Sequence, residues 1–288
     1  MPSEAQPVVY LNGEFMPAAE ARIPVLDRGF IYGDGVYELV PVYARQPFRM
    51  PQHLQRLQRS LDGIRLANPH GDAQWKALIG EIIARQAFED QAVYIQVTRG
   101  VARRDHAFPK DAVPTVFMMS NPLQTPSREQ VEHGVAVVTA EDNRWQRCDL
   151  KTTSLLGNVL MRQLAADAGA AETVMFRNGW LTEASSSNVL VVENGTIVAP
   201  PTDHQILPGI TYDAALEFAR DAGMALEVRP VAKAEALAAD EMWLSSSTKE
   251  VLAVTTIDGK PFAGGKPGPV FRKLWQAFQQ RKPASVAA

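Results

Sequence analysis

The alternation of apolar and polar positions along the chain predicts a mixed α/β fold. Short apolar runs with strand-like composition occur at residues 36–42, 93–98, 115–119, 135–139, 173–176, 189–192, 242–244 and 252–256. Dipeptides that tolerate positive φ in tight hairpins punctuate several of them, namely Asn12-Gly13, Asn178-Gly179, Asn194-Gly195 and Asp258-Gly259. The sequence therefore predicts sheets that are largely antiparallel.

Helical periodicity fills the intervals between these runs. In residues 50–67, Leu54, Leu57, Leu61 and Ile64 recur at steps of three and four, and Pro51 stands near the start, a favoured position for proline. Similar stripes occur at residues 72–88, 155–168, 212–222 and 269–280. The proline-containing stretch NPLQTPS interrupts the pattern as a connection between domains would. We expect a smaller N-terminal α/β domain at 1–122, a linker at 123–128 and a larger C-terminal α/β domain at 129–288.

Composition narrows the classes of protein. A net charge of -3 and a pI near 6.0 give no general attraction to nucleic acid or anionic membranes, so recognition of anions is expected to be local. With Cys148 as the single cysteine, the chain forms no internal disulfide and no cysteine zinc cluster. Neither a signal-peptide pattern nor a membrane-spanning apolar stretch is evident. We therefore expect a cytoplasmic protein without nucleic-acid or membrane partners.

Common catalytic motifs are missing from the sequence. It contains no GxxxxGK[ST] loop, no GxGxxG after a strand, no HExxH, no CxxC pair and no GxSxG elbow. The five histidines are too scattered to indicate a metal site. Reactive groups gather instead in five stretches: YGDGVYE at 32–38, RRDHAFP at 103–109, QRCDLKTTSLLGN at 146–158, LTEASSSN at 181–188 and LPGITYD at 207–213.

Two of the candidate features suit an anion. LPGITYD places Gly209 and Thr211 at the start of a predicted helix, where free N–H groups and the helix dipole bind phosphate. The ordinary alternative is a glycine turn with a threonine cap. SSST, residues 245–248, ends a predicted strand and can supply further donors, although a simple polar turn explains it equally well.

Lys151 and Glu183 are the candidate chemical groups. A partly desolvated lysine has a lowered pKa and forms a Schiff base with an aldehyde, whereas most lysines face solvent. Glu183 lies where an extended chain enters a serine-rich turn. A fixed carboxylate there can keep a heteroaromatic nitrogen protonated and make the ring an electron sink, whereas an ordinary turn carboxylate is only solvated.

The stretch RRDHAFP suits a carboxylate ligand. Arg104 and His106 lie two residues apart, so an extended loop points both side chains the same way. Two cationic donors so placed can clamp a carboxylate. The alternative is a basic surface loop.

The order of these motifs resembles that of the fold-type IV pyridoxal-phosphate enzymes. The series YGDGVYE, H-x-x-R-L, VTRG, CDxK, LLGN, TExSSSN, LxGITxD and SSST is most similar to the D-amino-acid aminotransferases, over about residues 11–274. The resemblance implies a two-domain fold, pyridoxal 5′-phosphate as cofactor, amino acids and 2-oxo acids as substrates, and a homodimer with active sites near the subunit interface.

The resemblance also assigns roles to individual residues. Lys151, in the larger domain, forms the Schiff base with the cofactor and serves as general acid and base. Glu183 pairs with the pyridine nitrogen, Leu207 presses on the ring face, and Tyr37, Arg104 and His106 trap the substrate carboxylate, which a neighbouring chain can help to complete. The phosphate ligands are Arg56, Ile210, Thr211, Ser246 and Ser247. Departures from the family pattern at Ala184, Pro208 and Tyr212 bear on affinity and substrate range, and Arg103 is an alternative to Arg104.

These roles predict a ping-pong transaminase that moves an amino group between a D-amino acid and a 2-oxo acid, of the D-alanine or D-glutamate type. The Arg-x-His pattern of RRDH favours D substrates, because branched-chain L-aminotransferases as a rule lack it. The alternatives are a branched-chain L-amino-acid transaminase, an (R)-amine transaminase, a lyase of the aminodeoxychorismate lyase type, and a cofactor-binding protein without activity.

Overall fold

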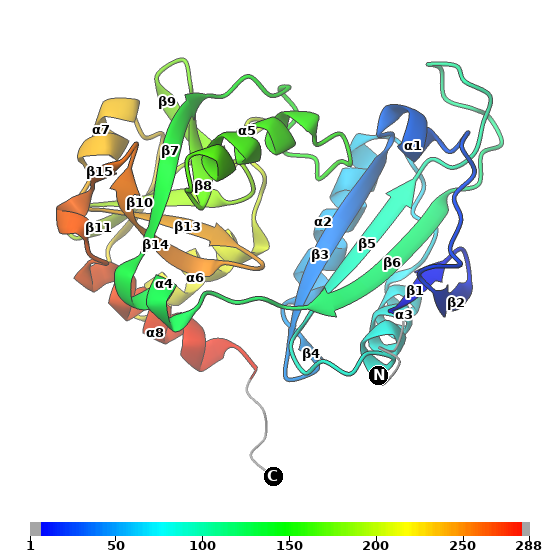
Figure 1. The fold of residues 1–288 in the computed structure, drawn as a ribbon, viewed down its shortest axis with the longest axis horizontal. Coiled ribbons are helices and arrows are strands. Elements are labelled where there is room, and N and C mark those ends of the chain that lie inside the picture. Colours follow the sequence, from blue (N-terminus) through cyan, green and yellow to red (C-terminus); the bar gives the residue numbers. More distant parts are fainter. Residues whose placement is uncertain (1–6, 284–288) are drawn as a thin grey trace, which may run out of the picture. The chain divides into compact units, whose positions relative to one another are not determined.

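The computed structural model describes residues 7–283, which form two compact units (Figure 1). Unit 1 contains the described residues up to Leu123, the short segment Leu150–Leu155, and Pro283. Unit 2 contains Gln124–Asp149 and Leu156–Lys282. The chain thus returns to unit 1 for one brief segment in the middle of unit 2.

Unit 1 is built on a six-stranded antiparallel sheet with the order β2-β1-β6-β5-β3-β4. The strands are β1 (Val8–Leu11), β2 (Glu14–Pro17), β3 (Gly35–Tyr43), β4 (Gln46–Pro47), β5 (Gln91–Thr98) and β6 (Thr115–Pro122). Asn12 and Gly13, with φ of 49° and 107°, form the β1–β2 hairpin that the sequence predicts.

Two helices cover one face of this sheet, α2 (Met50–Gly63) and α3 (Asp72–Ala84) (Figure 1). The predicted stripe of α2 is buried, since Leu54, Leu57 and Leu61 are at most 3 % exposed. The helix ends earlier than predicted because Arg65 adopts a φ of 56°. A shorter helix, α1 (Arg28–Tyr32), precedes β3 and is capped by the Asp27 carboxylate, which accepts from the Gly29 N–H.

Unit 2 is built on a nine-stranded mixed sheet with the order β12-β11-β10-β13-β14-β7-β8-β9, and β15 pairs with β14. Three pairs are parallel, β11 with β12, β14 with β7 and β7 with β8. The strands are β7 (Val135–Glu141), β8 (Glu172–Arg177), β9 (Trp180–Ala184), β10 (Asn188–Glu193), β11 (Thr196–Ala199), β12 (Leu226–Val228), β13 (Glu241–Ser246), β14 (Glu250–Ile257) and β15 (Lys260–Pro261). The mixed α/β class with largely antiparallel sheets is therefore confirmed.

The helices of unit 2 are α4 (Arg128–His133), α5 (Leu156–Asp167), α6 (Ile210–Asp221), α7 (Lys233–Ala238) and α8 (Pro269–Arg281), with a 3-10 turn at Ala263–Gly265. α6 packs against α8 through an edge contact of Phe218 with Phe278, whose ring centroids lie 5.7 Å apart. The sheet buries Val174, Phe176, Val191 and Leu244 completely.

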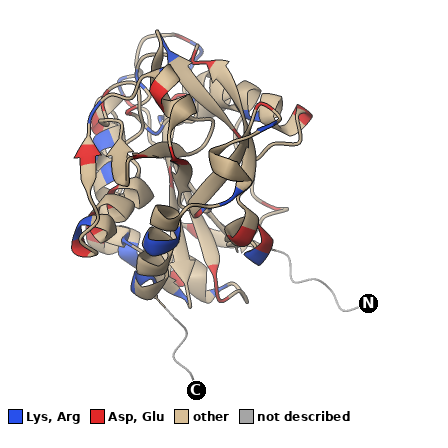
Figure 2. Cartoon of the chain, turned by 90° about the vertical axis from the view of Figure 1, so that its left-hand side faces the viewer, with Lys and Arg blue, Asp and Glu red and all other residues tan. Residues whose placement is uncertain are grey.

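Charged positions of both signs are scattered along the ribbon (Figure 2), in keeping with the small net charge. None of the helices in the described part of the chain combines the length and apolar character needed to cross a membrane. Residues 7–283 also contain no group of three or more His, Cys, Asp or Glu side chains arranged to hold a metal ion.

Candidate active site

Lys151 belongs to unit 1, although its position in the sequence predicts that it lies in the C-terminal domain. The reason is backbone pairing with β3, because the Tyr37 N–H donates to the Lys151 carbonyl at 2.9 Å and the Thr153 N–H to the Gly35 carbonyl at 3.0 Å. The Lys151 N–H donates to Ser60 Oγ of α2 at 3.2 Å. This segment thus pairs alongside the start of β3 through one isolated antiparallel bridge, Val36 with Thr152.

The Lys151 amine lies over an aromatic ring. Its Nζ is 4.2 Å from the centroid of Tyr37, which in turn stacks on Tyr94 with a centroid distance of 5.6 Å. Lys151 is half-buried, and in residues 7–283 its amine forms no hydrogen bond or ion pair. It is therefore a partly desolvated amine without a carboxylate partner, which is the state that suits a nucleophilic lysine.

A buried carboxylate lies on the opposite face of β3 from Tyr37. Glu38 is 0 % exposed and accepts from Arg56 of α2 through both of its oxygens, at 2.9 Å and 2.6 Å, while His53 Nδ1 lies 3.0 Å from it. Although burial raises the pKa of Glu38, Arg56 and His53 hold it well below its usual range. Arg56, expected to be a phosphate ligand, therefore has a structural partner as well.

Arg104 and His106 gather around Tyr32, the last residue of α1. The Arg104 guanidinium carbon lies 5.6 Å and the His106 ring 5.4 Å from the centroid of Tyr32. Arg28, which is buried, donates from Nη1 to the Asp105 and Ala107 carbonyls at 2.5 Å and 3.3 Å and so fixes this loop. Both side chains contact Tyr32, and among the described residues of unit 1 no contact joins them to Tyr37.

Glu183 lies in unit 2, at the end of β9, and is 5 % exposed. Its Oε1 accepts from Arg144 Nη1 at 2.6 Å, and its Oε2 from the Leu207 N–H at 3.1 Å and Asn188 Nδ2 at 3.4 Å. Burial raises the pKa of Glu183 to about 7, against the lowering effect of Arg144. The carboxylate is thus fixed in position and titrates near neutrality.

The tip of α6 carries the expected phosphate ligands Ile210 and Thr211. Gly209 is its N-cap residue and offers no side-chain cap, so the threonine-cap alternative does not apply. A Cβ on Gly209 would lie 1.9 Å from Asn188 Oδ1, which explains the glycine by close approach. The turn after β13 brings half-buried Ser246 and Ser247, with Ser246 Oγ accepting from the Lys249 N–H at 3.1 Å.

Comparison with known proteins identifies the family. Residues 35–257 match the family model described as amino-transferase class IV. The chain belongs to the class IV aminotransferase family. It is 38 % identical over 271 residues to the D-alanine aminotransferase of Bacillus licheniformis, covering 94 % of this chain and 95 % of the relative. Against the D-alanine aminotransferase of Staphylococcus aureus (strain N315), identity is 36 % over 273 residues, with 94 % and 96 % covered.

The fold of this class IV aminotransferase matches a solved structure closely. The branched-chain amino acid aminotransferase of Escherichia coli superimposes with a TM-score of 0.91 at 23 % identity, covering 96 % of this chain and 95 % of the other. This likeness confirms the fold-type IV architecture predicted from the motif order.

The expected site residues of this class IV aminotransferase form one set in each unit. Unit 1 holds Lys151, Tyr37, Arg56, Arg104 and His106. Unit 2 holds the remaining six, namely Glu183, Leu207, Ile210, Thr211, Ser246 and Ser247. In unit 2, the Leu207 N–H donates to the Glu183 carboxylate, and Asn188 Nδ2 donates both to Glu183 and to the Leu207 carbonyl, just before α6.

Sequence reasoning missed the residues that support Glu183. Asp142 binds Arg144 through both carboxylate oxygens, at 2.9 Å and 2.8 Å, and also pairs with Arg177 at 3.0 Å. Although burial raises the pKa of Asp142, Arg144 brings it below the usual value. The available sequence signal was Asp142 and Arg144, two residues apart just after the predicted strand 135–139. The same spacing occurs in solvated turns, so it does not predict a buried network.

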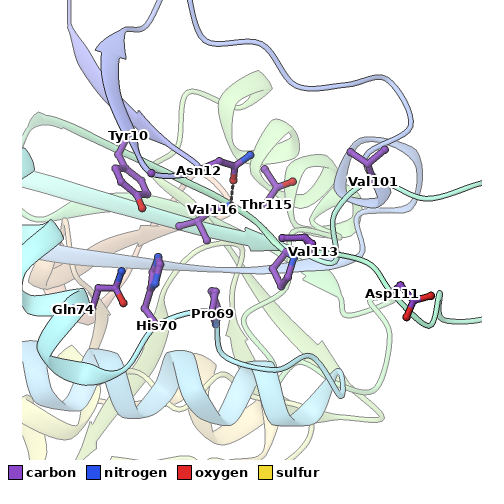
Figure 3. A pocket seen from close by; sticks show the side chains of 12 residues that line it. Tyr10, Asn12, Pro69, His70, Gln74, Val101, Asp111, Val113, Thr115 and Val116 are labelled. Carbon is purple, nitrogen blue, oxygen red and sulfur yellow. Dashed lines mark hydrogen bonds between the residues drawn. The ribbon is translucent and has the colours of Figure 1, made fainter.

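A separate cavity of about 700 Å³ lies in unit 1 and involves none of the expected site residues (Figure 3). Its wall includes Tyr10, His70, Gln74, Asp111 and Val113. Asn12, at its edge, accepts from the Val116 N–H at 2.8 Å and so belongs to the β1–β6 pairing. The cavity is therefore not the site that the motif order predicts.

Proposed function

We propose that this chain is a pyridoxal-phosphate-dependent transaminase that exchanges an amino group between a D-amino acid and a 2-oxo acid by a ping-pong mechanism. Two relatives at 36 % and 38 % identity, each covered over at least 95 % of its length, are D-alanine aminotransferases. The RRDH motif supports the same substrate hand, because it supplies Arg104 and His106 to hold a carboxylate.

The described residues fit pyridoxal 5′-phosphate. Lys151 offers an amine without a carboxylate partner, and Glu183 offers a buried acceptor that suits a protonated ring nitrogen. The start of α6 offers backbone N–H groups for the phosphate, beside the Ser246 and Ser247 hydroxyls. When bound, the cofactor supplies an aldehyde that takes up the amino group and a ring that withdraws electrons from the bond to be broken.

The residues of the chain provide binding and proton transfer. Lys151 Nζ would hold the cofactor through its aldehyde, and its amine would move a proton to and from the substrate Cα as general base and acid. Glu183 would face the ring nitrogen, and its position is fixed because Arg144 and the Leu207 N–H donate to its two oxygens. Leu207 is proposed to lie against the ring face.

Substrate handedness follows from the fixed carboxylate. When Tyr37, Arg104 and His106 hold the carboxylate on one side and Lys151 removes the Cα proton, only one enantiomer directs its side chain into the pocket. Arg104 and His106 contact Tyr32 rather than Tyr37 within unit 1. We therefore propose that they complete the carboxylate site of a neighbouring copy.

Exposed apolar side chains support a homodimer. On α5, Leu156, Val159, Leu160 and Leu164 lie at helical spacing and are between 47 % and 72 % exposed. In unit 1, Phe30 of α1 is 75 % exposed. Sedimentation of the purified protein is expected to give twice the chain mass, and a monomer at micromolar concentration would contradict the proposed shared site.

The observation that carries the proposed function is the half-buried Lys151 amine over Tyr37, in a chain of this family. The test is a single-turnover reaction of the cofactor-loaded protein with D-alanine or L-alanine, followed by cofactor absorbance. We expect D-alanine to react faster and pyruvate to form in stoichiometric amount until a 2-oxo acid is added. Equal rates or an L preference would refute the D assignment, and release of pyruvate from aminodeoxychorismate without an acceptor would indicate a lyase.

A further inference from the structure

A buried carboxylate outside the expected cofactor contacts joins two turns of unit 2. Glu172, at the start of β8, is 0 % exposed and accepts from four side chains. The donors are the hydroxyls of Ser185, of Ser186 at 2.5 Å and of Ser187 at 2.8 Å, and Lys249 Nζ at 2.9 Å. Burial raises the pKa of Glu172, but Lys249 and the serines hold it below its usual value. Glu172 is therefore an ionised acceptor.

The first of the two turns runs from Glu183 to Asn188. The Ala184 N–H donates to the Ser187 carbonyl at 2.7 Å and closes it. At its far end, Asn188 Nδ2 donates to the Leu207 carbonyl at 2.8 Å, and its Oδ1 fills the space that a Cβ on Gly209 would need. The conformation of this serine turn therefore positions Glu183 and the start of α6.

The second turn, residues 247–249, follows β13, which ends at Ser246. Lys249 reaches Glu172 and Ser186 Oγ with its amine, at 2.9 Å and 3.2 Å. Its backbone N–H donates to Ser246 Oγ at 3.1 Å. One lysine thus ties Ser246, an expected phosphate ligand, to the same carboxylate that holds the serine turn.

We propose that Glu172 is a positioning residue of the cofactor site, which holds the Glu183 turn and the Ser246 turn in register so that ring nitrogen and phosphate are bound together. It acts through Ser185–Ser187 and Lys249 and needs no contact with the cofactor itself. This inference rests on the proposed function, because it takes the two turns to be cofactor-binding elements. Its measurable consequence is cofactor affinity rather than the rate of the loaded enzyme.

The test compares Glu172→Gln with a matched control in unit 2. Glutamine keeps the size of the side chain but removes the charge that pairs with Lys249. Glu241→Gln is the control, because Glu241 is also buried and accepts from the Val270 and Phe271 N–H groups at the start of α8. Glu241 lies at the opposite end of β13 from Ser246, about 17 Å away at the rise of a strand.

Pyridoxal phosphate is titrated into each apo protein, with thermal unfolding of the same samples as a check on folding. Glu172→Gln is expected to raise the dissociation constant about tenfold or more, the effect of one lost charge-assisted hydrogen bond, whereas Glu241→Gln leaves it unchanged. Lys249→Met is also expected to raise the dissociation constant. Combining it with Glu172→Gln should raise the constant little further, since both substitutions remove the same ion pair between Lys249 and Glu172.

Wild-type affinity in Glu172→Gln, or equal weakening in Glu172→Gln and Glu241→Gln, would overturn the inference. Should Glu172→Gln fail to fold, unchanged affinity in a folded Lys249→Met would overturn it instead. Titration of the wild type without amino acid separates the two proposals. Cofactor binding without D-amino-acid turnover refutes the proposed reaction alone, whereas a wild type that binds no cofactor refutes both.

Discussion

Arg144 Nη1 lies 2.6 Å from Glu183 Oε1, and both side chains are buried. Asp142 holds the other side of the same guanidinium, so Arg144 cannot move away from Glu183 without breaking two further hydrogen bonds. This arrangement opposes the effect of burial, which nevertheless raises the pKa of Glu183 to about 7, so the carboxylate is partly ionised near neutral pH.

The first prediction concerns Arg144. Replacing it with methionine removes the cation, so the pKa of Glu183 should rise further and its support of the ring nitrogen should weaken. We expect kcat to fall roughly thirtyfold or more, the equivalent of about 2 kcal/mol for a hydrogen bond between charged groups. Arg144→Lys keeps the charge and should retain more of the rate. Steady-state kinetics at saturating cofactor measures both, and equal losses in the two variants would point to packing rather than charge.

A second prediction concerns pH. The raised pKa of about 7 means that folded Glu183 holds a proton that the unfolded chain, in which the pKa has its ordinary value of 4.5, has already lost. Its contribution to stability is therefore fully present below pH 4.5 and is lost as pH rises through 7. The free energy of unfolding of the apo wild type, minus that of apo Glu183→Gln, should decrease over this interval. A difference that is flat or rises with pH would show that burial does not dominate at Glu183.

The third prediction separates two roles of Arg56. Because Glu38 is fully buried and binds Arg56 through both oxygens, Arg56→Met leaves a buried carboxylate whose remaining side-chain contact in residues 7–283 is His53 Nδ1. We expect the apo protein to lose about 3 kcal/mol of stability, and the double variant Glu38→Gln with Arg56→Met to recover part of it. Denaturant unfolding without cofactor provides the measurement. Unchanged apo stability would mean that Arg56 serves only the phosphate.

The fourth prediction concerns the substrate carboxylate. Arg104→Leu should lower kcat/KM for a D-amino acid by about 2 kcal/mol, roughly thirtyfold, because a charged hydrogen bond to the substrate is lost. Arg103→Leu is the matched control, since Arg103 is its equally exposed neighbour. A larger loss in Arg103→Leu would transfer the role to that residue and shift the loop assignment.

Strand positions were predictable from the sequence wherever apolar runs were long enough. All eight predicted strands occur, and the four Asn-Gly and Asp-Gly pairs adopt positive φ in hairpins. Short elements such as α1, β4 and β12 were not predicted, because their sequences, RGFIY, QP and LEV, contain no sustained apolar run. The unit that contains Lys151 also escaped, because one bridge to Val36 and two backbone hydrogen bonds decide it, and none of these has a sequence signature.

The candidate site was predictable where a motif names a residue and not where a neighbour supports it. Lys151, Glu183 and Gly209 came from motif order, although the reason for Gly209 is its close approach to Asn188. The supporting residues Arg144 and Glu172 could not be predicted in this way. Most charged residues are exposed, and only the tertiary structure shows that these two are buried. Similarly, the Glu38 partner of Arg56 follows from the packing of α2 on β3, which one sequence does not reveal.

The most direct test of the account locates the lysine that binds the cofactor. The purified protein is loaded with pyridoxal phosphate, reduced with borohydride to fix any Schiff base, digested and mapped by mass spectrometry. We expect the pyridoxyl group on the peptide that contains Lys151, and we expect both this group and the visible absorbance to be lost in Lys151→Ala. A pyridoxyl group on another lysine, or an unchanged spectrum in Lys151→Ala, would contradict it.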